Sequence, residues 1–383
     1  MRGLFYYRTH FDDPQNAGVV KKCRNIAAAF QLHDCHGDTI FFSQEGLLLN
    51  ERVWGRWPIR APKGSIRHAL LFFIFADLVL LHRLHFADYQ FILIRHMPTH
   101  PGFLFFLHRL KRNHPHLKII LDFPTWPYDL ELGQGVRGRL LLWLDRRCRQ
   151  WLLRYVSLAL HSGPETDIWG IRSLQIADGI RPEDFPAKGP VSADRHSLSL
   201  VFAGRIAHWH GLDRVLLGLK QYYAGGKDQL ASRISFTIIG QGDASAALQH
   251  LTQQWGLESC VRFVGTQNAQ ELWAYYEQAD LAVGSLARHR IGIKEGTPLK
   301  HREYCAVGLP FVFAGGDADF SPEFPYALQI PADDTPLDMI ALQHFYQQIT
   351  KERAFRGQMQ AFARSQLSWT VKVRPVVTYL HNG

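Results

Sequence analysis

The chain has 383 residues, which is too many for one ordinary hydrophobic core and enough for two domains of usual size. Hydrophobic residues make up 46% and charged residues 20%, a balance that excludes a disordered chain and indicates a globular protein. With 43 Lys and Arg against 34 Asp and Glu, the net charge of +9 favours an anionic partner: a nucleotide, a nucleic acid or an anionic membrane surface.

Cysteine usage and apolar runs bear on the compartment. The five cysteines are scattered and form no CxxC pair, which argues against a disulfide framework or a zinc site and fits a reducing cytosol. The opening MRGLFYYRTHFDDP places an acidic pair where the apolar core of a signal peptide should continue. The longest apolar run, Ala69 to Leu81, is too short to span a bilayer and contains Asp77. We therefore expect a cytoplasmic protein, or one bound peripherally to the inner face of the cell membrane.

The first half alternates strand and helix signals. The predicted strands are GLFYY at 3–7, DTIFFS at 38–43, YQFILIR at 89–95, LKIILDF at 117–123, VSLALHS at 156–162 and SLQIADG at 173–179. The first predicted helix begins near Val19, after a loop that ends at Gly18, and the second begins after Ser65. Two further helices are predicted from Pro101 to Asn113 and from Arg137 to about Tyr155. This repetition indicates a parallel sheet covered on both faces.

A polar stretch with Pro, Gly and Ser then predicts a linker, and a second series follows it. Its strands are SLSLVFAG at 197–204, ISFTIIGQG at 234–242, CVRFVG at 260–265, DLAVGS at 280–285 and LPFVFAG at 309–315. Its first predicted helix runs from Leu212 to Tyr223, the second ends near Trp255, the third runs through Tyr275 and the fourth starts at Thr297. The tail from Ser368 predicts a last helix that returns to the first domain.

The fold class is therefore α/β, with two doubly wound domains facing each other across a cleft at the carboxyl ends of their strands, where such sheets bind ligands. We expect the first domain at 1–184 with the returning segment 370–383, a linker at 185–197 and the second domain at 198–369.

The stretch IGIKEGTPLKHREYCAVGLP, from Ile291 to Pro310, contains two acidic residues with seven residues between them. Thr297 is predicted to cap a helix whose first residue is Pro298, with Gly308 at its left-handed end. Glu295 then lies in the preceding loop, and Glu303 lies about 7.5 Å along the helix axis from Pro298.

The start of this helix predicts an anion site, because its N–H groups and its dipole favour negative charge. Glu303 would accept hydrogen bonds from a diol such as ribose, so the spacing matches a nucleoside diphosphate lying along the helix start. The alternative, an ordinary capped helix with a solvated Glu303, stays open on these residues alone.

Glycines at three other strand ends point to the same edge of the sheet. Gly204 precedes Arg205, whose guanidinium could bind a diphosphate. Gly240 and Gly242 form a GxG pair, which is a weak signal alone, and Gly265 could frame a base with its backbone.

Taken together, the ordered segments GRIAHWHGLD, FTIIGQGD, VRFVG, ELWAYYEQADLAV and KEGTPLKHREYCAVGLPFV resemble the nucleotide-binding domain of GT-B glycosyltransferases of the retaining group with an E-x7-E motif. This resemblance covers about residues 200–314. The first half, with GVVKK, IRHMP and LDFPTWPYDLE, is similar to the acceptor domain of the members that assemble bacterial polysaccharides.

The resemblance implies a role for each matching residue. Glu303 would hold the ribose hydroxyls and Glu295 would lie near the donor sugar. Gly18, Arg205 and the backbone at Gly296, Thr297 and Leu299 would face the donor phosphates. The strand-end glycines Gly204, Gly240 and Gly265 are counted among the residues that bind the nucleotide sugar. The family usually has Lys five residues after Arg205, where this chain has His210, so Lys300 is considered as a substitute.

The implied chemistry builds negative charge on the departing diphosphate, which Arg205, His210 or Lys300 and the helix start would stabilise. No metal and no cofactor are expected, since protein charges can do this and no DxD pair is placed as a ligand. Asp317 and Asp319 follow AGG, and we interpret them as solvated loop residues.

The first half offers a second cluster. Trp126 and Tyr128 could stack on sugar faces, and Asp129 or Glu131 could accept a proton from an acceptor hydroxyl. The alternative is a rigid loop with both rings packed inward. Arg95 and His96 end a strand, where they could contact the donor or, instead, pair with Asp122.

The predicted helix from Arg137 to Tyr155 interleaves arginines with tryptophans and leucines. Such a helix can lie on an anionic leaflet, or it can be an ordinary sheet-covering helix with a basic outer face. A lipid-linked acceptor would make membrane contact useful.

The function predicted from the resemblance is retaining, nucleotide-sugar-dependent transfer of a hexose-type sugar from a UDP- or GDP-linked donor to a glycan or lipid-linked acceptor in bacterial surface polysaccharide and exopolysaccharide assembly. No nucleic-acid partner is expected. The alternatives are a non-catalytic basic protein that binds nucleotide or membrane, and an epimerase of the same architecture.

Overall fold

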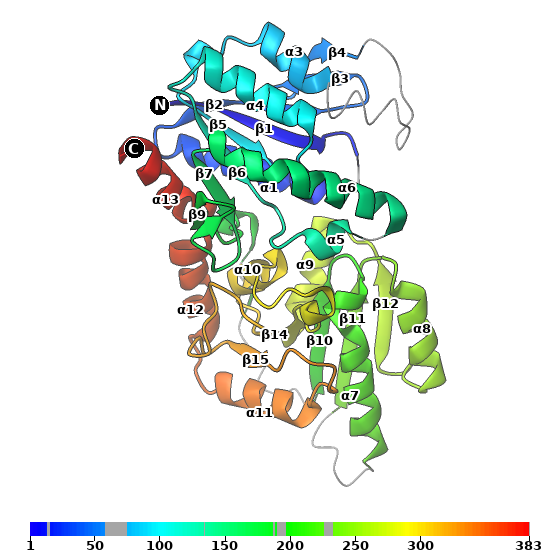
Figure 1. Ribbon diagram of the computed structural model, residues 1–383. Helices are drawn as coiled ribbons and strands as arrows, with labels where there is room; N and C mark the ends of the chain where they lie inside the picture. The colour runs from blue at the N-terminus through cyan, green and yellow to red at the C-terminus, as the bar shows by residue number, and fades with distance from the viewer. Residues whose placement is uncertain are drawn as a thin grey trace. The chain divides into compact units, whose positions relative to one another are not determined.

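The computed structural model describes residues 1–13, 16–57, 75–133, 135–186, 188–189, 197–225 and 233–382. It divides into two compact units, Met1–Ala177 with Trp369–Gly383 and Asp178–Ser368 (Figure 1). The first boundary thus falls before the predicted position 184. Most of the predicted linker 185–197 and the part of the apolar run before Phe75 lie outside the described residues.

The first unit is built on a nine-stranded sheet in the order β4-β3-β2-β1-β5-β6-β7-β9-β8. Its strands are β1 (Arg2–His10), β2 (His36–Phe42), β3 (Gly46–Leu49), β4 (Arg52–Arg56), β5 (Phe91–Arg95), β6 (Lys118–Asp122), β7 (Leu158–His161), β8 (Asp167–Ile168) and β9 (Ile171–Gln175). The six strands from β2 through β1, β5, β6 and β7 to β9 pair in parallel, as predicted. The antiparallel edge strands β3, β4 and β8 were not predicted, because short hairpin strands give little periodic signal.

Helices cover both faces of this sheet. The helices of the unit are α1 (Ala17–Gln31), α3 (Ala76–Arg83), α4 (Pro101–Asn113), α5 (Asp129–Leu132), α6 (Gly135–Cys148) and α13 (Trp369–Asn382). Because side chains alternate along a strand, Leu4 and Tyr6 of β1 share a core with α3 and α4. Phe5 and Tyr7 share the opposite core with α1 and α13.

The second unit has a fully parallel six-stranded sheet in the order β12-β11-β10-β13-β14-β15. Its strands are β10 (Ser197–Ala203), β11 (Arg233–Ile239), β12 (Val261–Gly265), β13 (Leu281–Val283), β14 (Phe311–Ala314) and β15 (Ala327–Ile330). All but β15 were predicted. Each is short and apolar, as expected for strands buried on both faces.

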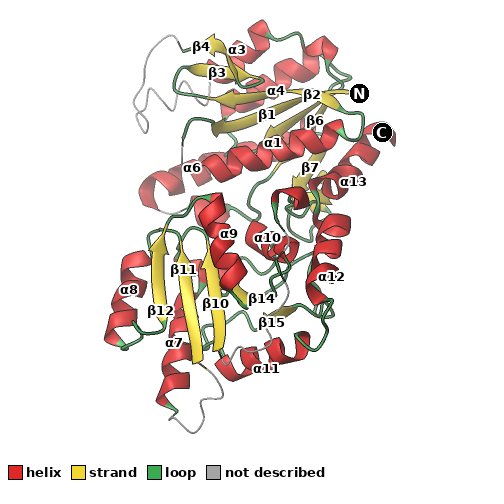
Figure 2. Ribbon diagram, turned by 180° about the vertical axis from the view of Figure 1, so that it is seen from behind, coloured by secondary structure: helices red, strands yellow, loops and turns green. Residues whose placement is uncertain are grey.

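The helices of the second unit are α7 (Leu212–Ala224), α8 (Ser245–Gln254), α9 (Ala269–Gln278), α10 (Leu299–Val307), α11 (Met339–Ile349) and α12 (Phe355–Phe362). One core joins Leu200 and Phe202 of β10 to α7, α8 and α11. The other joins Val201 of β10 to α9, α10 and α12, and Figure 2 views the sheet from the side of α9. The prediction of two doubly wound α/β domains is confirmed.

Two predicted helices differ in their bounds. The helix expected from Arg137 to Tyr155 is α6 followed by a 3-10 helix at Arg149–Arg154, and α1 begins at Ala17, so that Gly18 lies in its first turn and not before it. Within the described ranges, no helix has both the length and the apolar character needed to cross a bilayer.

Candidate functional site

In the second unit, three strand-end loops are hydrogen-bonded to one another at the carboxyl edge of the sheet. The N–H of Gly204 donates to Ile239 at 3.0 Å, the N–H of Ile206 to Gln241 at 3.0 Å, and the N–H of Gly240 to Gly265 at 2.7 Å. The loops after β10, β11 and β12 therefore form one rigid backbone surface.

Gly240 shows why this surface requires glycine. Its φ is +124°, and a Cβ atom there would lie 2.0 Å from the carbonyl oxygen of Gly204. The residue is thus fixed first by the approach of two protein backbones, which is a structural reason besides any contact with a ligand.

Helix α10 meets this surface, but it begins later than predicted. Its first residue is Leu299, with Pro298 in the cap position at φ −59° and ψ 127°. The hydroxyl of Thr297 accepts from the N–H of Asp178 at 3.0 Å and does not cap the helix. The predicted N-cap at Thr297 is therefore wrong, because its buried hydroxyl is engaged in tying the loop to residue 178. Gly308 ends the helix at φ +77°, as predicted.

Tyr304 anchors α10 to the strand ends. Its hydroxyl accepts from the N–H of Ala203 and donates to the carbonyl of Val283, both at 3.3 Å. The neighbouring Glu303 is half-buried, and its charge acts on Lys300.

Lys300 lies directly under the turn at Gly204. The Nζ atom of Lys300 would lie 3.3 Å from a Cβ atom placed on Gly204. The same Nζ atom lies 3.8 Å from the ring centroid of Phe202 and 3.5 Å from Nδ1 of His210. Burial lowers the pKa of Lys300 to about 7, against the opposing effect of Glu303. An anion bound here would restore its full positive charge.

His210 lies five residues after Arg205, at the position where the sequence resemblance implies Lys. Its Nδ1 lies 3.1 Å from Oγ of Ser285, and burial, followed by the charge of Lys300, holds its pKa well below the ordinary range. The ring is therefore neutral at physiological pH, so the positive charge that this pair carries resides on Lys300. Lys300 and His210 thus lie side by side, with Nζ and Nδ1 3.5 Å apart, and the role of Lys300 as a substitute stays a prediction.

Arg205 differs from these groups in being exposed. Its side chain is 69% accessible, and one Nη lies 3.5 Å from Oδ1 of Asp243. It stands at the end of β10, with its guanidinium 5.8 Å from the ring of Trp209.

Glu295 lies in the loop before α10, as predicted, and is half-buried. It forms an isolated parallel β-bridge with Gly316, and the N–H of Gly296 donates to the carbonyl of Gly316 at 3.2 Å. Buried Arg288 donates to the same carbonyl at 2.7 Å. A Cβ atom on Gly296 would lie 2.2 Å from Nη1 of Arg288, so this loop is closely packed.

Asp317 and Asp319 are not solvated, which corrects the sequence interpretation. The side chain of Asp317 is 0% exposed and accepts from Nδ1 of His301 at 2.8 Å and from Nη1 of Arg302 at 2.6 Å. Asp319 also pairs with Arg302. Although burial opposes it, the charge of Arg302 holds the pKa of Asp317 well below its ordinary value.

Sequence reasoning missed the residues of this network: Ser285, Arg288, His301, Arg302 and Asp317. No spacing rule connects them, since Asp317 and Arg302 are brought together only by the return of the chain through β14. The sequence LKHREYCAV gave no local signal of this burial, because its Lys, His, Arg and Glu are typical of an exposed helix.

In the first unit, His96 is buried, with 5% of the residue exposed, and its ring makes contacts through both an edge nitrogen and a face. Its Nε2 lies 3.1 Å from Oγ1 of Thr99, and its ring lies 4.3 Å from that of Phe123. Burial lowers its pKa to about 3, so the ring is neutral. Arg95 pairs with Asp122 at 3.7 Å, the alternative that the sequence left open.

Asp129 is held by two cations. Arg146 and Arg149 bind its carboxylate at 2.9 Å and 2.7 Å. Burial would raise the pKa of Asp129, but the hydrogen bonds from these arginines bring it below the ordinary value. A carboxylate stabilised in this way is a poor proton acceptor, which weighs against its predicted role as the base. The side chain of Glu131 lies outside what the structure describes.

Trp126 and Tyr128 pack inward, against the idea that both are open stacking platforms. Trp126 lies 5.5 Å from Trp169, and Tyr128 lies 6.2 Å from the same ring. The hydroxyl of Tyr128 donates to Asp145 at 2.8 Å. Gly18, also in this unit, is exposed, with nothing within 4 Å of an added Cβ atom.

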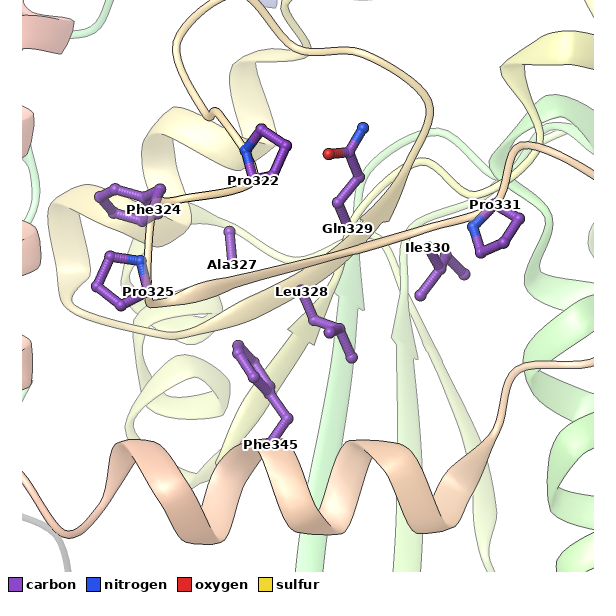
Figure 3. Close-up of a pocket in the computed structure, with 9 residues that line it drawn as sticks. All are labelled: Pro322, Phe324, Pro325, Ala327, Leu328, Gln329, Ile330, Pro331 and Phe345. Atoms are coloured by element: carbon purple, nitrogen blue, oxygen red, sulfur yellow. The ribbon is translucent and has the colours of Figure 1, made fainter.

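A shallow hollow of about 520 Å³ lies elsewhere in the second unit, between β15 and α11, and Phe345 rises into it from α11 toward Leu328 (Figure 3). It is lined by Pro322, Phe324, Pro325, Ala327, Leu328, Gln329, Ile330, Pro331 and Phe345. None of the predicted site residues lines it. Across the described part of the chain, no group of three or more His, Cys, Asp or Glu side chains could hold a metal ion.

Part of the sequence is similar to known glycosyltransferases. The sequence profile of the family described as glycosyl transferases group 1 matches residues 190–315. The amylovoran biosynthesis glycosyltransferase AmsK of Erwinia amylovora is 31% identical over 134 residues, which is 35% of this chain and 31% of that protein. The match to this curated relative thus spans about a third of its length.

Solved structures show the fold over the whole chain. Sucrose-phosphate synthase from Thermosynechococcus elongatus has a TM-score of 0.65 at 15% identity, covering 100% of this chain and 99% of that one. HepE of Anabaena, solved in complex with UDP, has a TM-score of 0.64 at 13% identity and covers 100% of both chains. WaaG, a glycosyltransferase involved in lipopolysaccharide biosynthesis, has a TM-score of 0.59 at 14% identity and covers 100% of both. Residues 190–315 are therefore a glycosyltransferase group 1 domain, carried in a chain with the GT-B fold.

Proposed function

We propose that the chain is a retaining glycosyltransferase that moves a hexose-type sugar from a UDP- or GDP-linked donor to a glycan or lipid-linked acceptor in bacterial surface polysaccharide assembly. The observation that carries this proposal is the convergence of three strand-end loops on α10, with Lys300 beneath Gly204 and its charge coupled to Glu303. The names of AmsK and WaaG support the polysaccharide context.

The proposed chemistry uses groups of the second unit. Leu299 and Lys300 open α10, whose dipole favours the departing diphosphate, and Lys300 and Arg205 add positive charge. Glu303 would hold the ribose hydroxyls and Glu295 would lie at the donor sugar. No bound metal or organic cofactor is part of the proposal.

Titration calorimetry with UDP, GDP and ADP tests the donor site. We expect a sub-millimolar Kd for UDP or GDP, because a charge-assisted phosphate site exceeds about 4 kcal/mol of binding free energy. A screen of nucleotide sugars should then show release of the matching diphosphate. No binding of any nucleoside diphosphate would favour a basic membrane-binding protein, and conversion of the sugar without release of diphosphate would favour an epimerase.

Glu295→Ala separates the donor sugar from the nucleotide. We expect turnover to fall about tenfold or more, a loss of at least about 1.4 kcal/mol of transition-state stabilisation, with the Kd for UDP or GDP unchanged. A fully active variant would remove Glu295 from the mechanism.

The surface of α6 and the following 3-10 helix supports peripheral membrane contact for this enzyme. Val136, Leu140 and Trp143 recur at i, i+4 and i+7 and form one stripe, and they are 76%, 66% and 56% exposed. Leu142, Asp145 and Cys148 are the buried residues of α6. The stripe therefore lies on the side of α6 opposite to its buried residues.

Arginines surround this stripe. The exposed ones are Arg137, Arg139, Arg146, Arg147 and Arg154. Arg147 lies 5.5 Å from the ring of Trp143, and Arg154 lies 4.2 Å from the ring of Trp151, which is 47% exposed. Basic groups around exposed aromatic rings match the headgroup region of an anionic leaflet.

Co-sedimentation with vesicles of phosphatidylcholine, with and without phosphatidylglycerol, tests this contact. We expect binding only with the anionic lipid, and a fall in partitioning of about tenfold or more for Leu140→Ser with Trp143→Ser, since each buried apolar side chain contributes about 1.5–3 kcal/mol. Leu32→Ser is the matched control, because Leu32 is 72% exposed at the end of α1. Equal binding by the double variant and the wild type would contradict the assignment to α6.

A further inference from the structure

Asp317 is a fully buried carboxylate in the site region of the second unit. It lies in the loop that follows β14, and its buried side chain accepts from two successive residues of α10. His301 donates through Nδ1 at 2.8 Å, and Arg302 donates through both terminal nitrogens. Glu303 is the next residue of the same helix.

The same loop is joined on its other side to the segment that carries Glu295. The N–H of Gly316 donates to the carbonyl of Lys294 at 2.9 Å, and the N–H of Gly296 donates back to Gly316 at 3.2 Å. A Cβ atom on Gly316 would lie 3.1 Å from Cγ of Glu295, so the side chain of Glu295 runs along this glycine.

His301 connects Asp317 to the loop that contains Ser285. Burial lowers the pKa of His301 to about 4, so the ring is neutral and carries its proton on Nδ1, which faces Asp317. Its Nε2 accepts from the N–H of Ser285 at 3.3 Å. The hydroxyl of Ser285 lies 3.1 Å from His210. One carboxylate thus links the Glu295 loop, α10 and the loop that faces Lys300.

We propose that Asp317 is a positioning residue for glycosyl transfer: through Gly316 it fixes Glu295 at a set distance from Glu303, without itself contacting the substrate. This inference rests on the proposed function, because it assigns Asp317 a role in placing the two acids of the donor site. The competing view, that Asp317 only stabilises the fold, predicts a loss of stability with unchanged turnover per folded molecule.

Asp317→Asn tests the inference, because asparagine keeps the volume and cannot accept from all four donors of Asp317, which are Nδ1 of His301, both terminal nitrogens of Arg302 and the N–H of Asp319. We expect turnover per active site to fall about tenfold, since small misplacements of a reacting group cost rates of this order or more. The Kd for UDP or GDP should change less than about threefold, because Tyr304 holds α10 to the sheet independently. Unchanged turnover with lowered stability would overturn the inference.

A double-mutant cycle with Glu295→Ala identifies the residue through which Asp317 acts. If the path runs through Glu295, Asp317→Asn should lower turnover by less than about twofold in the Glu295→Ala background. A second tenfold fall there would show that Asp317 acts by another path and would overturn the proposal.

Gly316→Ala is a second variant that leaves the ion pairs of Asp317 in place. Its Cβ would press on the side chain of Glu295 and displace it, so we expect the same loss of turnover with nucleotide affinity retained. Wild-type turnover in this variant would contradict the proposed path.

Amide hydrogen exchange gives a readout that does not depend on activity. Exchange at Gly296 and Gly316 should be faster in Asp317→Asn than in the control Asp280→Asn, whose buried carboxylate accepts from Ser199 and Tyr346 at the start of β13. Equal exchange in the two variants would refute the positioning role even if the protein transfers sugar. If the wild type binds no nucleotide, the proposed function fails while this comparison still tests the link.

Discussion

Arg302→Met is expected to lower the free energy of unfolding by about 3–5 kcal/mol, the range measured when one partner of a buried ion pair is removed. The side chain of Arg302 is 0% exposed, and it binds Asp317 and Asp319, which are 0% and 10% exposed. Methionine fills most of the volume but leaves both carboxylates without their shared cation. Chemical denaturation at pH 7 measures the loss.

The pH dependence of this loss has a defined sign. In the wild type the folded-state pKa of Asp317 is lowered, so its stabilisation is present above the ordinary carboxyl pKa and is lost as the pH falls through the folded value. In Arg302→Met, Asp317 stays buried without its guanidinium partner, so its pKa rises. Protonation of Asp317 then removes a buried charge that has lost its counter-ion. The difference in unfolding free energy between variant and wild type should therefore be largest near pH 7. It should begin to narrow above about pH 4, where Asp317 of the variant becomes protonated, and should narrow further below about pH 4 as the wild type loses its own stabilisation.

Arg262→Met is the control for this experiment. Arg262 is exposed on β12, so its replacement should change the free energy of unfolding by less than about 0.5 kcal/mol. A difference between Arg302→Met and the wild type that stays constant from pH 7 to pH 3 would contradict the ion-pair account.

Glu303→Ala is expected to weaken UDP or GDP binding by about 1.5–3 kcal/mol, which corresponds to a rise in Kd of about 10- to 150-fold. The carboxylate would lose its charge-assisted hydrogen bonds to the ribose hydroxyls. Glu303→Gln retains one acceptor oxygen and should lie between the alanine variant and the wild type. Titration calorimetry measures all three constants.

Glu258→Ala is the matched control for Glu303. Glu258 is an exposed carboxylate just before β12, at the opposite edge of the sheet from the strand-end loops, so its removal should leave the Kd unchanged. An unchanged Kd in Glu303→Ala would show that the ribose assignment is wrong, whatever the activity of the protein.

The fold was predictable from the sequence because apolar strands and their flanking turns are local signals. Helix α4 was predicted with the bounds Pro101–Asn113 that the structure shows, since Pro101 and the cap at His100 begin it. The parallel order of strands followed from the alternation of strands and helices. The elements missed were the hairpin strands, the short helix α5 and the segments after β14, where periodicity is weak.

The site was predictable in part. Gly204, Gly240 and Gly265 were expected at strand ends, and the structure joins those ends by hydrogen bonds, since the carboxyl ends of parallel strands share one edge. The roles implied for the predicted residues remain predictions. The cap at Thr297 could not be judged from sequence, because its hydroxyl had a competing partner at residue 178, 119 positions away.

The sequence alone determined two α/β domains, the edge at which ligands are expected and the pair of acids on either side of the start of α10. Only the tertiary structure decided which charges are available there. Burial keeps His210 neutral and lowers the pKa of Lys300 to about 7. Asp317, interpreted from the sequence as a solvated loop residue, is buried and binds Arg302. Local spacing cannot supply this information, because desolvation and charge pairing depend on neighbours that the chain brings together from distant positions.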